Sequence, residues 1–514
     1  MIAKVQSCGL IGLDGFIVDV EVDISMGLPA FDIVGLPDTA VKESKERVRS
    51  AMKNSNLESP IKRITVNLAP ADKKKEGPAY DLPITIAILI ASEQIKINNI
   101  NEIEQYMFLG ELSLDGKLRP INGALPMVIT AMQHGIKKVF LPKQNMDEAA
   151  VVSGIDVLGA DNLYEIVQHL RGEIEIMPYT VDIDELFKVN NQYPIDFSDV
   201  KGQQNVKRAL EVAVAGGHNI IMIGSPGSGK SMLAKRIPTI LPDLTFEEAL
   251  ETTKIHSIAG TLPNGVALLT TRPFRSPHHT ISAVALAGGG GIPRPGELSL
   301  SHNGILFLDE LPEFQRNVLE VMRQPLEDGV VTISRINATL TYPCNTLFAA
   351  SMNPCKCGYY GDTVRECTCT PPQISKYIGK ISGPLLDRID IHIEVASVKY
   401  ADMDSDEKTE TSAEIKKRVN TARKLQLARY ANEGIYSNSA LSPAQIRKYC
   451  RLGKGEKELL KMAFDNLGLS ARAHDRILKV ARTIADLDNS ENISINHIAE
   501  AIQYRSLDRK FWGA

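Results

Sequence analysis

One eight-residue segment of the chain, GSPGSGKS, has the residue types and spacing of a phosphate-binding loop. Its glycines let successive backbone N–H groups point inward at phosphate oxygens, at the positive end of the helix that follows. Lys230 can reach the β- and γ-phosphates, and the hydroxyl of Ser231 can ligate magnesium. The apolar run NIIMIG precedes the loop and a helical stretch follows, as such a loop requires. The loop comprises Gly224, Ser225, Pro226, Gly227, Ser228, Gly229, Lys230 and Ser231.

A second segment, GILFLDE at 304–310, supplies the acidic groups that a nucleotide site needs. Four apolar residues predict a buried strand that ends at Asp309 and Glu310, and ligands of parallel sheets bind at the carboxyl ends of strands. Asp309 is predicted to hold Mg2+, and Glu310 to activate the attacking water. This pattern is a weak signal alone, but about 80 residues after a phosphate loop it indicates ATP hydrolysis.

Four cysteines form a CxC-x9-CxC pattern, Cys355, Cys357, Cys367 and Cys369. Four thiolates within 15 residues suit a tetrahedral zinc ion, which would stabilise a loop too short to have a core of its own. The usual spacing of zinc ligands is CxxC, so reduced unliganded cysteines and an iron–sulfur cluster stay open as alternatives.

These motifs lie in a chain of 514 residues with 58 basic and 62 acidic side chains, a net charge of −4. This balance excludes a polycation, so any contact with DNA must come from a local patch. The longest apolar stretch, 82–91, has ten residues, about half of a membrane span. The seven cysteines do not form a disulfide framework. We expect a cytoplasmic protein of about three domains that does not enter the membrane.

Two changes of composition divide the chain. Residues 178–198 contain acids, an NNQ cluster and a proline and are typical of a linker, and residues 398–411 are acidic with little to bury. We therefore expect a first domain at 1–177, a core at 199–397 that includes the cysteine loop 355–369, and a helical domain at 412–514.

The coarse periodicity of each block is consistent with this division. Alternating apolar residues predict strands at 15–24 and 61–68, and helical patterns occur at 81–94 and 125–134. The middle block alternates helix, strand, loop and helix, which favours a three-layer α/β sheet. The last block is helical, with long runs at 413–431 and 472–487.

Longer strings show that the chain resembles AAA+ ATPases of the magnesium-chelatase-like group, and specifically the ComM/YifB family. The matching strings are RPFRSPHHTISAVALAGGGGIPRPGELSLSHNGILFLDELPEF, SGPLLDRIDIHIEV and SARAHDRILKVARTIADL. The resemblance covers essentially the whole chain. It implies an α/β AAA+ P-loop core with a helical lid, preceded by an α+β Lon-protease-like domain.

The family pattern implies further roles for single residues. Asn353 corresponds to sensor 1, which helps to position the attacking water. Arg388 corresponds to the arginine finger, which reaches the γ-phosphate of a neighbouring subunit. Arg472 corresponds to the sensor-2 arginine, with Arg476, one helical turn away, as the competing assignment. The alternative that both arginines only form salt bridges at the surface stays open. Because a finger acts only on a neighbour, we expect a homo-oligomeric ring, a hexamer.

The first block resembles the Lon protease domain through GPAYDLPITIAIL and LGELSLDGKLRPINGALPMVITAMQHGIKKVFLP. In an active site of that type, a serine nucleophile is paired with a lysine. Here those positions align with Ala79 and Leu125. Alanine carries no nucleophile and leucine cannot act as a base, so we expect the fold without the peptidase chemistry.

Three segments are candidates for contact with DNA. Asp-Gly between β-prone residues predicts a hairpin at 327–335, and the corresponding hairpin of the related MCM helicases faces the ring channel. The segment 271–295 corresponds to a channel-facing insertion of that group and offers Arg275 and Arg294 to phosphates. The basic stretch 416–429 is more typical of a solvated helix face.

The resemblance implies that branched or single-stranded DNA is the substrate of a helicase that drives branch migration in recombination or natural transformation. A chelatase-like or protein-remodelling ATPase would use the same core with a protein partner, and this class stays open. An ATP-dependent protease is disfavoured by Ala79 and Leu125. Stimulation of ATP hydrolysis by DNA distinguishes the first two classes.

Overall fold

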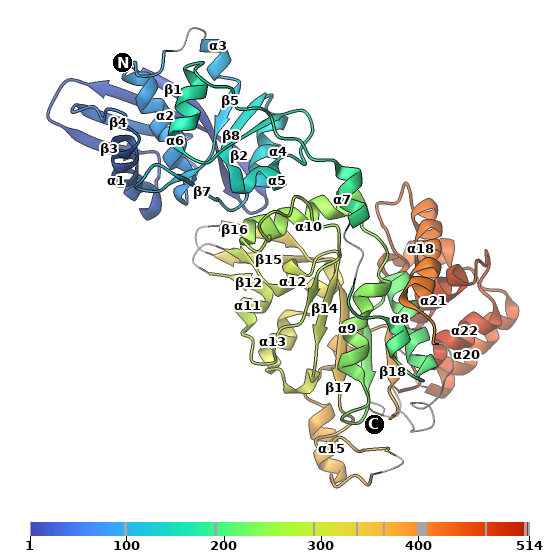
Figure 1. The fold of residues 1–514 in the computed structure, drawn as a ribbon. Coiled ribbons are helices and arrows are strands. Elements are labelled where there is room, and N and C mark those ends of the chain that lie inside the picture. Colours follow the sequence, from blue (N-terminus) through green and yellow to red (C-terminus); the bar gives the residue numbers. More distant parts are fainter. Residues whose placement is uncertain are drawn as a thin grey trace. The chain divides into compact units, whose positions relative to one another are not determined.

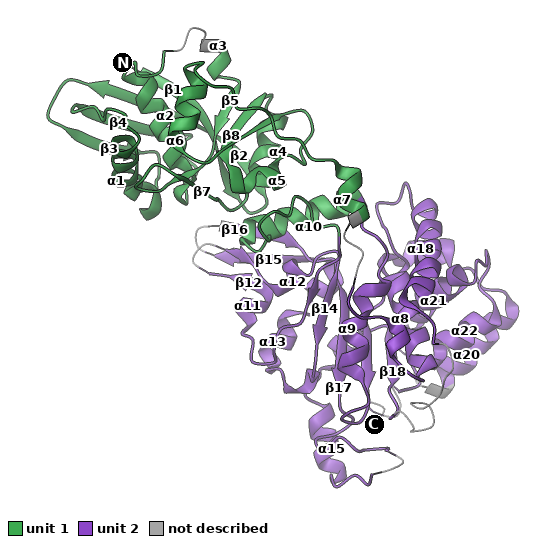
Figure 2. Cartoon of the chain, viewed as in Figure 1, with its two compact units in different colours: residues 1–190, 246–270 green, residues 191–245, 271–514 purple. Residues whose placement is uncertain are grey.

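The computed structural model describes residues 2–96, 100–189, 193–290, 293–335, 338–362, 365–397, 409–467, 470–507 and 511. The chain forms two compact units, residues 1–190 with 246–270 and residues 191–245 with 271–514 (Figure 2). Of the two expected linkers, residues 190–192 and 398–408 lie outside the described residues. Within the described ranges, no helix is long and apolar enough to cross a membrane.

The first unit is built around a seven-stranded sheet in the order β3–β4–β2–β1–β5–β8–β9 (Figure 1). Neighbours run antiparallel from β1 through β2 to β4, and parallel from β1 through β5 and β8 to β9. The strands expected at 15–24 and 61–68 are confirmed as β2 and β4. The strands are β1 (Ile2–Ile11), β2 (Asp14–Ser25), β3 (Ala30–Val34), β4 (Arg63–Ala69), β5 (Tyr106–Phe108), β8 (Lys138–Pro142) and β9 (Asp156–Ala160).

Two apolar clusters pack on opposite faces of this sheet. Met107 and Val139 belong to one cluster, while the next residues along the strands, Phe108 and Phe140, belong to the other. Successive side chains of a strand point to opposite faces, which produces this division. The helices expected at 81–94 and 125–134 are confirmed as α2 and α4. The remaining elements are α1 (Thr39–Asn54), α2 (Asp81–Ala91), α3 (Ile100–Ile103), β6 (Glu111–Leu112), β7 (Leu118–Arg119), α4 (Ala124–Gln133), α5 (Met146–Ala149), α6 (Leu163–Leu170) and α7 (Ile183–Val189).

Helix α10 (Phe246–Ala259) belongs to the first unit, although the sequence analysis assigned it to the core at 199–397. Its Leu250 packs against the apolar cluster that contains Ala79 and Leu125. The backbone N–H of Gly123, at the start of α4, donates to the carbonyl of Ser257 at 3.0 Å. Ala79 and Leu125, the residues expected at the dyad positions, are therefore buried in a cluster that α10 helps to cover.

A buried carboxylate ties α10 to the rest of this unit. Glu148 of α5 accepts hydrogen bonds from Ser257 Oγ at 2.5 Å, from Asn145 Nδ2 at 2.7 Å and from the backbone N–H of Leu125 at 3.4 Å. Burial raises the pKa of Glu148, and these three donors act in the opposite direction. Each donor is therefore needed, since a buried carboxylate that lacks partners is costly.

Ser257→Ala is expected to loosen α10 from the first unit. The substitution removes one donor from a buried carboxylate, at a cost of about 1–3 kcal/mol. Amide hydrogen exchange measured over α10 should become faster, while Ser153→Ala, at an exposed site of the same unit, should leave it unchanged. Equal exchange in both variants would mean that the Glu148–Ser257 bond does not hold the helix.

The second unit contains a five-stranded parallel sheet in the order β11–β14–β17–β10–β18. All four residues of β10 and all four of β14 are buried, as expected for strands covered on both faces. The parallel sheet confirms the α/β class predicted for the middle block. The strands are β10 (Ile220–Ile223), β11 (Phe274–Arg275), β14 (Ile305–Leu308), β17 (Leu347–Met352) and β18 (Ile391–Glu394).

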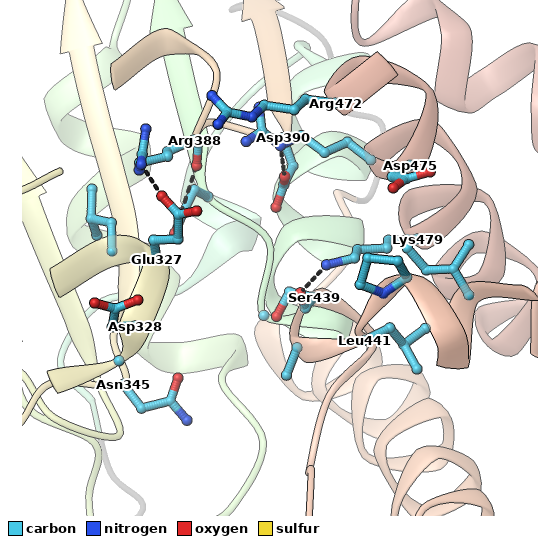
Figure 3. Close-up of a pocket in the computed structure, with 18 of the residues that line it drawn as sticks. Glu327, Asp328, Asn345, Arg388, Asp390, Ser439, Leu441, Arg472, Asp475 and Lys479 are labelled. Carbon is cyan, nitrogen blue, oxygen red and sulfur yellow. Dashed lines mark hydrogen bonds and ion pairs between the residues drawn. The ribbon is translucent and has the colours of Figure 1, made fainter. Parts of the chain in front are cut away.

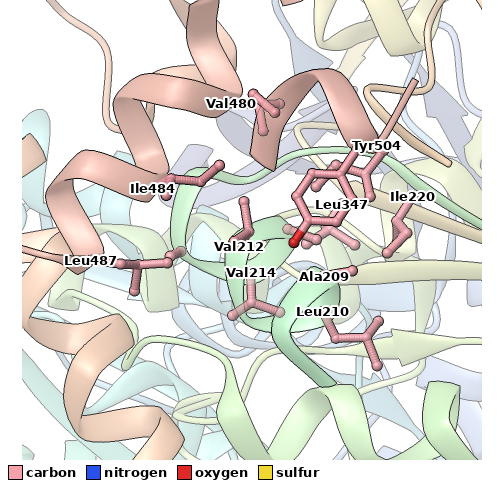
Figure 4. Close-up of a cluster of buried hydrophobic side chains, with 14 of the residues drawn as sticks. Ala209, Leu210, Val212, Val214, Ile220, Leu347, Val480, Ile484, Leu487 and Tyr504 are labelled. Carbon is pink, nitrogen blue, oxygen red and sulfur yellow. The ribbon is translucent and has the colours of Figure 1, made fainter. Parts of the chain in front are cut away.

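The carboxyl-terminal helices share one core with this sheet. Figure 4 shows Val212 and Val214 of α8 among side chains of α21 such as Ile484, together with Ile220 and Leu347 of the sheet. The helices expected at 413–431 and 472–487 are confirmed as α18 and α21. The helices of this unit are α8 (Gln204–Gly216), α9 (Lys230–Ile240), α11 (Ala283–Ala287), α12 (Glu297–Leu300), α13 (Arg316–Val321), α14 (Pro325–Asp328), α15 (Pro371–Ile378), α16 (Gly383–Leu386), α18 (Ser412–Arg429), α19 (Pro443–Tyr449), α20 (Lys454–Leu467), α21 (Ala471–Leu487) and α22 (Ile495–Gln503).

The hairpin turn predicted at Asp328–Gly329 is wrong. These residues end the short helix α14, where Gly329 takes a left-handed φ of 68° as its cap. The hairpin begins after them: β15 (Val330–Arg335) pairs antiparallel with β16 (Ala338–Pro343). Its turn, residues 336–337, lies outside the described residues. A second small hairpin, β12 (Gly288–Gly289) with β13 (Arg294–Pro295), lies beside it, since a Cβ added to Gly288 would meet Ile333 Cδ1 at 2.8 Å.

Candidate nucleotide site

The structure places the phosphate loop between β10 and α9, at the carboxyl edge of the parallel sheet. Gly227 and Gly229 have left-handed φ values of 80° and 88°, which residues with a Cβ rarely adopt. Helix α9 starts at Lys230, so its free N–H groups and positive dipole end face the loop. The sequence motif thus has the strand–loop–helix context that phosphate binding requires.

Lys230 lies at the centre of the loop. Its Nζ donates to the carbonyls of Gly224 at 2.7 Å and Ser225 at 2.9 Å, and to Asn353 Oδ1 at 3.2 Å. Burial lowers the pKa of Lys230, and the negative charges of Asp309 and Glu310 oppose this shift. The structure therefore brings Lys230, at the start of α9, together with Asn353, which directly follows β17 and is the residue expected to act as sensor 1.

Asp309 follows β14 and faces the loop. Its Oδ2 accepts a hydrogen bond from Ser231 Oγ at 2.6 Å, and its Oδ1 accepts one from Ser351 Oγ. Glu310, the next residue, is exposed and has a φ of 54°. That left-handed backbone is unfavourable for glutamate by about 1 kcal/mol or more and directs the chain away from the strand immediately after Asp309.

Sequence reasoning missed two residues that support this site. Ser351, fully buried in β17, orients Asp309, and its only sequence signal is a hydroxyl inside the apolar strand LFAASM. Gln203 donates from Nε2 to the carbonyls of Ser228 at 2.8 Å and Ala396 at 3.0 Å. No local pattern around Gln203 indicates this contact, because its acceptors come from distant parts of the chain.

These side chains fit a magnesium nucleotide. The loop offers backbone N–H groups and an ammonium group for phosphates, while the Ser231 hydroxyl and the Asp309 carboxylate are the oxygen ligands that Mg2+ prefers. The two oxygens already lie 2.6 Å apart, so one ion can bind both after a small adjustment.

The four cysteines also converge. Their sulfur atoms all lie within 4.8 Å of one another, and the Sγ of Cys355 is 3.3 Å from that of Cys357 and 3.7 Å from that of Cys367. Tetrahedral zinc with bonds of about 2.3 Å separates its sulfur ligands by about 3.8 Å. The donor set and its spacing therefore fit one zinc ion.

The arginines at 388, 472 and 476 line a different cavity, of about 670 Å³ (Figure 3). Arg388 forms an ion pair with Glu327 and donates from Nη1 to the carbonyl of Pro384 at 2.7 Å. Burial lowers the pKa of Arg388, and the neighbouring positive charges of Arg323, Arg472 and Arg476 lower it further. The Nε of Arg388 and the Nη1 of Arg476 are buried donors without a hydrogen-bond partner among the described residues. The cavity also contains four carboxylates, Glu327, Asp328, Asp390 and Asp475.

This cavity lies at the amino edge of the sheet. Asn219, which precedes β10, and Asn345, which precedes β17, both line it. The phosphate loop follows β10 at the other end, and a strand of four residues spans about 13 Å. The structure therefore does not bring Arg388 or Arg472 to the Lys230 of the same chain.

The two competing sensor-2 arginines differ in their surroundings. Arg476 has a side chain that is 15% exposed, and its Nε lies 3.2 Å from Asp390 Oδ1. Arg472 is 62% exposed, and its one ion pair, with Asp387, is 3.7 Å long. Arg476 is fixed inside the unit, whereas Arg472 is free to turn toward a ligand.

Arg476→Ala is expected to lower the thermal stability of the protein, whereas Arg472→Ala is not. Removal of Arg476 leaves the buried carboxylate of Asp390 with one partner fewer, which costs roughly 1–3 kcal/mol. Removal of the exposed Arg472 should change stability by about 0.5 kcal/mol or less. Circular dichroism melting curves of the two variants check this, and equal losses would contradict the assignment of Arg476 as the structural residue.

One residue expected to contact DNA is engaged elsewhere. Both Nε and Nη2 of Arg275 donate to the carboxylate of Glu297, at 2.6 and 2.7 Å, so the expectation that Arg275 is available to phosphates is wrong. Arg294 is exposed on β13, opposite Gly289. Arg335, exposed at the end of β15, places its Nη2 3.1 Å from where a Gly289 Cβ would lie. Arg294 and Arg335 thus form a small basic patch on two adjacent hairpins.

The basic helix α18 uses its arginines internally. Arg418 donates to Glu211 Oε1 at 2.5 Å, and Arg429 binds both oxygens of the buried Asp486 at 2.6 and 2.9 Å. Lys416 pairs with Asp243 at 2.7 Å. These bonds hold α18 to neighbouring elements, which disfavours a continuous DNA-binding surface there.

Comparison with known proteins assigns this fold and site to a family. Residues 196–403 match the family described as "Magnesium chelatase, subunit ChlI". Residues 20–145 match the family "Subunit ChlI of Mg-chelatase". Residues 409–505 match the family "Magnesium chelatase, subunit ChlI C-terminal". The chain is 43% identical over 511 residues to competence protein ComM of Haemophilus influenzae, which covers 99% of this chain and 98% of that protein. It is 44% identical over 510 residues to YifB of Escherichia coli, with coverage of 98% and 97%.

One further relative matches only part of the chain. Lon protease 2 of Bacillus subtilis is 23% identical over 189 residues, 33% of each chain. This match supports a Lon-like domain.

A parallel P-loop sheet with an acidic strand end, followed by a helical region that matches the subunit ChlI C-terminal family, defines an AAA+ protein of the magnesium-chelatase-like class. Within that class, the chain belongs to the ComM/YifB family. The resemblance drawn from the sequence strings is thereby confirmed.

Proposed function

We propose that the protein is an ATP-hydrolysing ring motor that acts on DNA. The main support for a ring is the distance between the proposed catalytic groups of one chain. The phosphate loop lies at the carboxyl edge of the sheet, whereas Arg388 and Arg472 line a cavity at the amino edge. A head-to-tail contact between copies would bring one chain's arginines to the next chain's phosphates, and such contacts close into rings. The family resemblance implies six subunits.

In the proposed reaction, each group at the site has one task. Lys230 and the loop N–H groups bind the β- and γ-phosphates, and Ser231 and Asp309 would hold Mg2+, which neutralises phosphate charge when bound. Glu310 accepts a proton from the attacking water. Arg388 of the neighbouring subunit stabilises the charge that develops on the transferred phosphoryl group. Asn353 also orients the water, since its hydrogen bond to Lys230 keeps it beside the phosphates.

We also propose that Cys355, Cys357, Cys367 and Cys369 hold one zinc ion. The support is the convergence of four sulfur atoms within 4.8 Å. The loop between the two CxC pairs is short, and a structural metal is the usual way to give such a loop a fixed shape.

DNA as the substrate is supported by two observations. The relative from Haemophilus influenzae is named a competence protein, which favours a role in natural transformation as a branch-migrating helicase. Arg294 and Arg335 form a basic patch on paired hairpins in an otherwise slightly acidic chain. Two arginines that bind phosphates give affinity without sequence preference, as a motor requires.

One alternative has its own support. Three segments match families of a magnesium chelatase subunit, which favours an ATPase that remodels a protein partner with the same core. The response of ATP hydrolysis to DNA distinguishes the two functions.

Arg388→Ala and Glu310→Gln are each expected to abolish ATP turnover, and mixing the two proteins should partly restore it. In a mixed ring, the intact Glu310 of one subunit meets the intact Arg388 of its neighbour. ATPase assays across mixing ratios, with native mass spectrometry to prove that rings are mixed, measure the recovery. Verified mixed rings without recovery at any ratio would show that Arg388 does not act across a subunit boundary.

DNA is expected to stimulate hydrolysis, four-way junctions more than duplex or single strands, and the effect should fall steeply with salt. The double variant Arg294→Ala, Arg335→Ala should reduce the ratio of rates with and without DNA. The matched control is Lys417→Ala, Lys424→Ala, which removes two exposed charges from α18 and should keep the ratio. If no DNA form changes the rate at low salt in a demonstrable ring, the protein-partner function replaces the helicase.

A further inference from the structure

The segment that carries the four cysteines lies directly after the sensor strand. It is here named the cysteine knuckle and comprises residues 355–369; it begins two residues beyond Asn353 and ends just before α15. Residues 363–364 of the knuckle lie outside the described residues. The knuckle therefore connects a residue that contacts Lys230 with the helices that lead to Arg388.

The knuckle contacts the phosphate loop at two points. Ser225 Oγ donates a hydrogen bond to Asp362 Oδ2. Gly358, with a left-handed φ of 90°, packs so closely on Pro226 that an added Cβ would lie 2.5 Å from the proline Cδ. Ser225 and Pro226 are the second and third residues of the phosphate loop, so the position of the knuckle bears directly on the shape of that loop.

The shape of the knuckle depends on its cysteines. The backbone N–H of Cys357 points at the Sγ of Cys369 at 3.4 Å, and the N–H of Cys369 points at the Sγ of Cys367 at 3.4 Å. The first contact joins the two ends of the segment, and the second lies within one CxC pair. Hydrogen bonds to metal ligands orient those ligands.

Asp362 is held from the side of the cysteines as well. Its Oδ1 accepts from the backbone N–H of Arg365 at 3.0 Å, and Arg365 in turn bonds the hydroxyl of Tyr359 at 2.8 Å. Gly358 and Tyr359 directly follow Cys357, and Arg365 lies two residues before Cys367. Both contacts with the phosphate loop therefore come from chain that the cysteine pairs enclose.

We propose that zinc in the cysteine knuckle holds the phosphate loop in its nucleotide-binding shape, with Asp362 and Gly358 as the positioning residues. The inference rests on the ATP and zinc sites proposed above and adds a coupling between them. Loss of the metal would release the enclosed segment and with it the contacts that hold Ser225 and Pro226. ATP binding would then weaken although no residue of the phosphate loop has been substituted.

The test measures zinc and nucleotide binding on the same samples. In a Glu310→Gln background, which should bind ATP without turnover, a fluorescent ATP analogue gives Kd and elemental analysis gives zinc per chain. Cys367→Ser, Cys369→Ser should lose zinc and raise Kd by roughly tenfold or more. Removal of zinc with a zinc-selective chelator in the presence of excess Mg2+ should do the same, and added zinc should restore the original Kd.

Asp362 variants separate coupling from metal loss. Asp362→Ala should keep one zinc per chain and raise Kd by roughly three- to tenfold, the value of one hydrogen bond. Asp362→Asn keeps an acceptor for Ser225 and should restore most of the affinity. Glu366→Ala, at an exposed site in the same knuckle, should match the parent protein in zinc content and Kd.

Each failure has a distinct meaning. A parent protein that binds ATP but holds no zinc overturns the metal site and this inference, while the ATPase assignment stands. Zinc-free protein that binds ATP with the parent Kd overturns the coupling alone. An unchanged Kd in Asp362→Ala removes Asp362 from the positioning role. A parent protein that does not bind ATP at all contradicts the proposed function itself.

Discussion

The parallel pairing of β10, β14 and β17 is the constraint on which the rest of the second unit depends. Parallel strands end at the same edge of a sheet, so the loops that follow them meet there. Lys230, Asp309 and Asn353 follow three of these strands and are separated by up to 123 residues of sequence, yet Lys230 bonds Asn353 and the adjacent Ser231 bonds Asp309. The buried Ser351 of β17 also contributes from inside the sheet, because its hydroxyl donates a hydrogen bond to the carboxylate of Asp309.

The same sheet keeps the phosphate loop and three arginines apart, at its two opposite edges. Its amino edge gathers Arg388, Arg472 and Arg476 around a cavity whose buried N–H donors lack partners among the described residues. Glu327 and Asp390 compensate part of the charge within the chain. An arrangement with phosphate ligands at one edge and arginines at the other suits repetition around a ring.

The first unit buries Ala79 and Leu125, the residues expected at the dyad positions of a Lon-like domain, in an apolar core. Ala79 and Leu125 pack in a cluster that Leu250 of α10 helps to cover, and Glu148 ties Ser257 of the same helix to the domain. Helix α9 starts at Lys230, and α10 follows it after a short connection. The chain therefore runs from the phosphate loop through α9 directly into α10, which belongs to the first unit.

Local patterns in the sequence determined the phosphate loop, the acidic strand end, the cysteine set and most long elements, because each is encoded by neighbouring residues whose types and spacing carry the signal. The family strings added Asn353, Arg388 and Arg472. Only the tertiary structure decided that α10 packs with the Lon-like domain, that the hairpin follows Gly329, that Arg275 is bound to Glu297, and that Asp362 contacts Ser225. These features depend on partners far away in the chain or on competition between several short-range options, and neither the composition nor the spacing of a segment shows which distant group its side chains will meet.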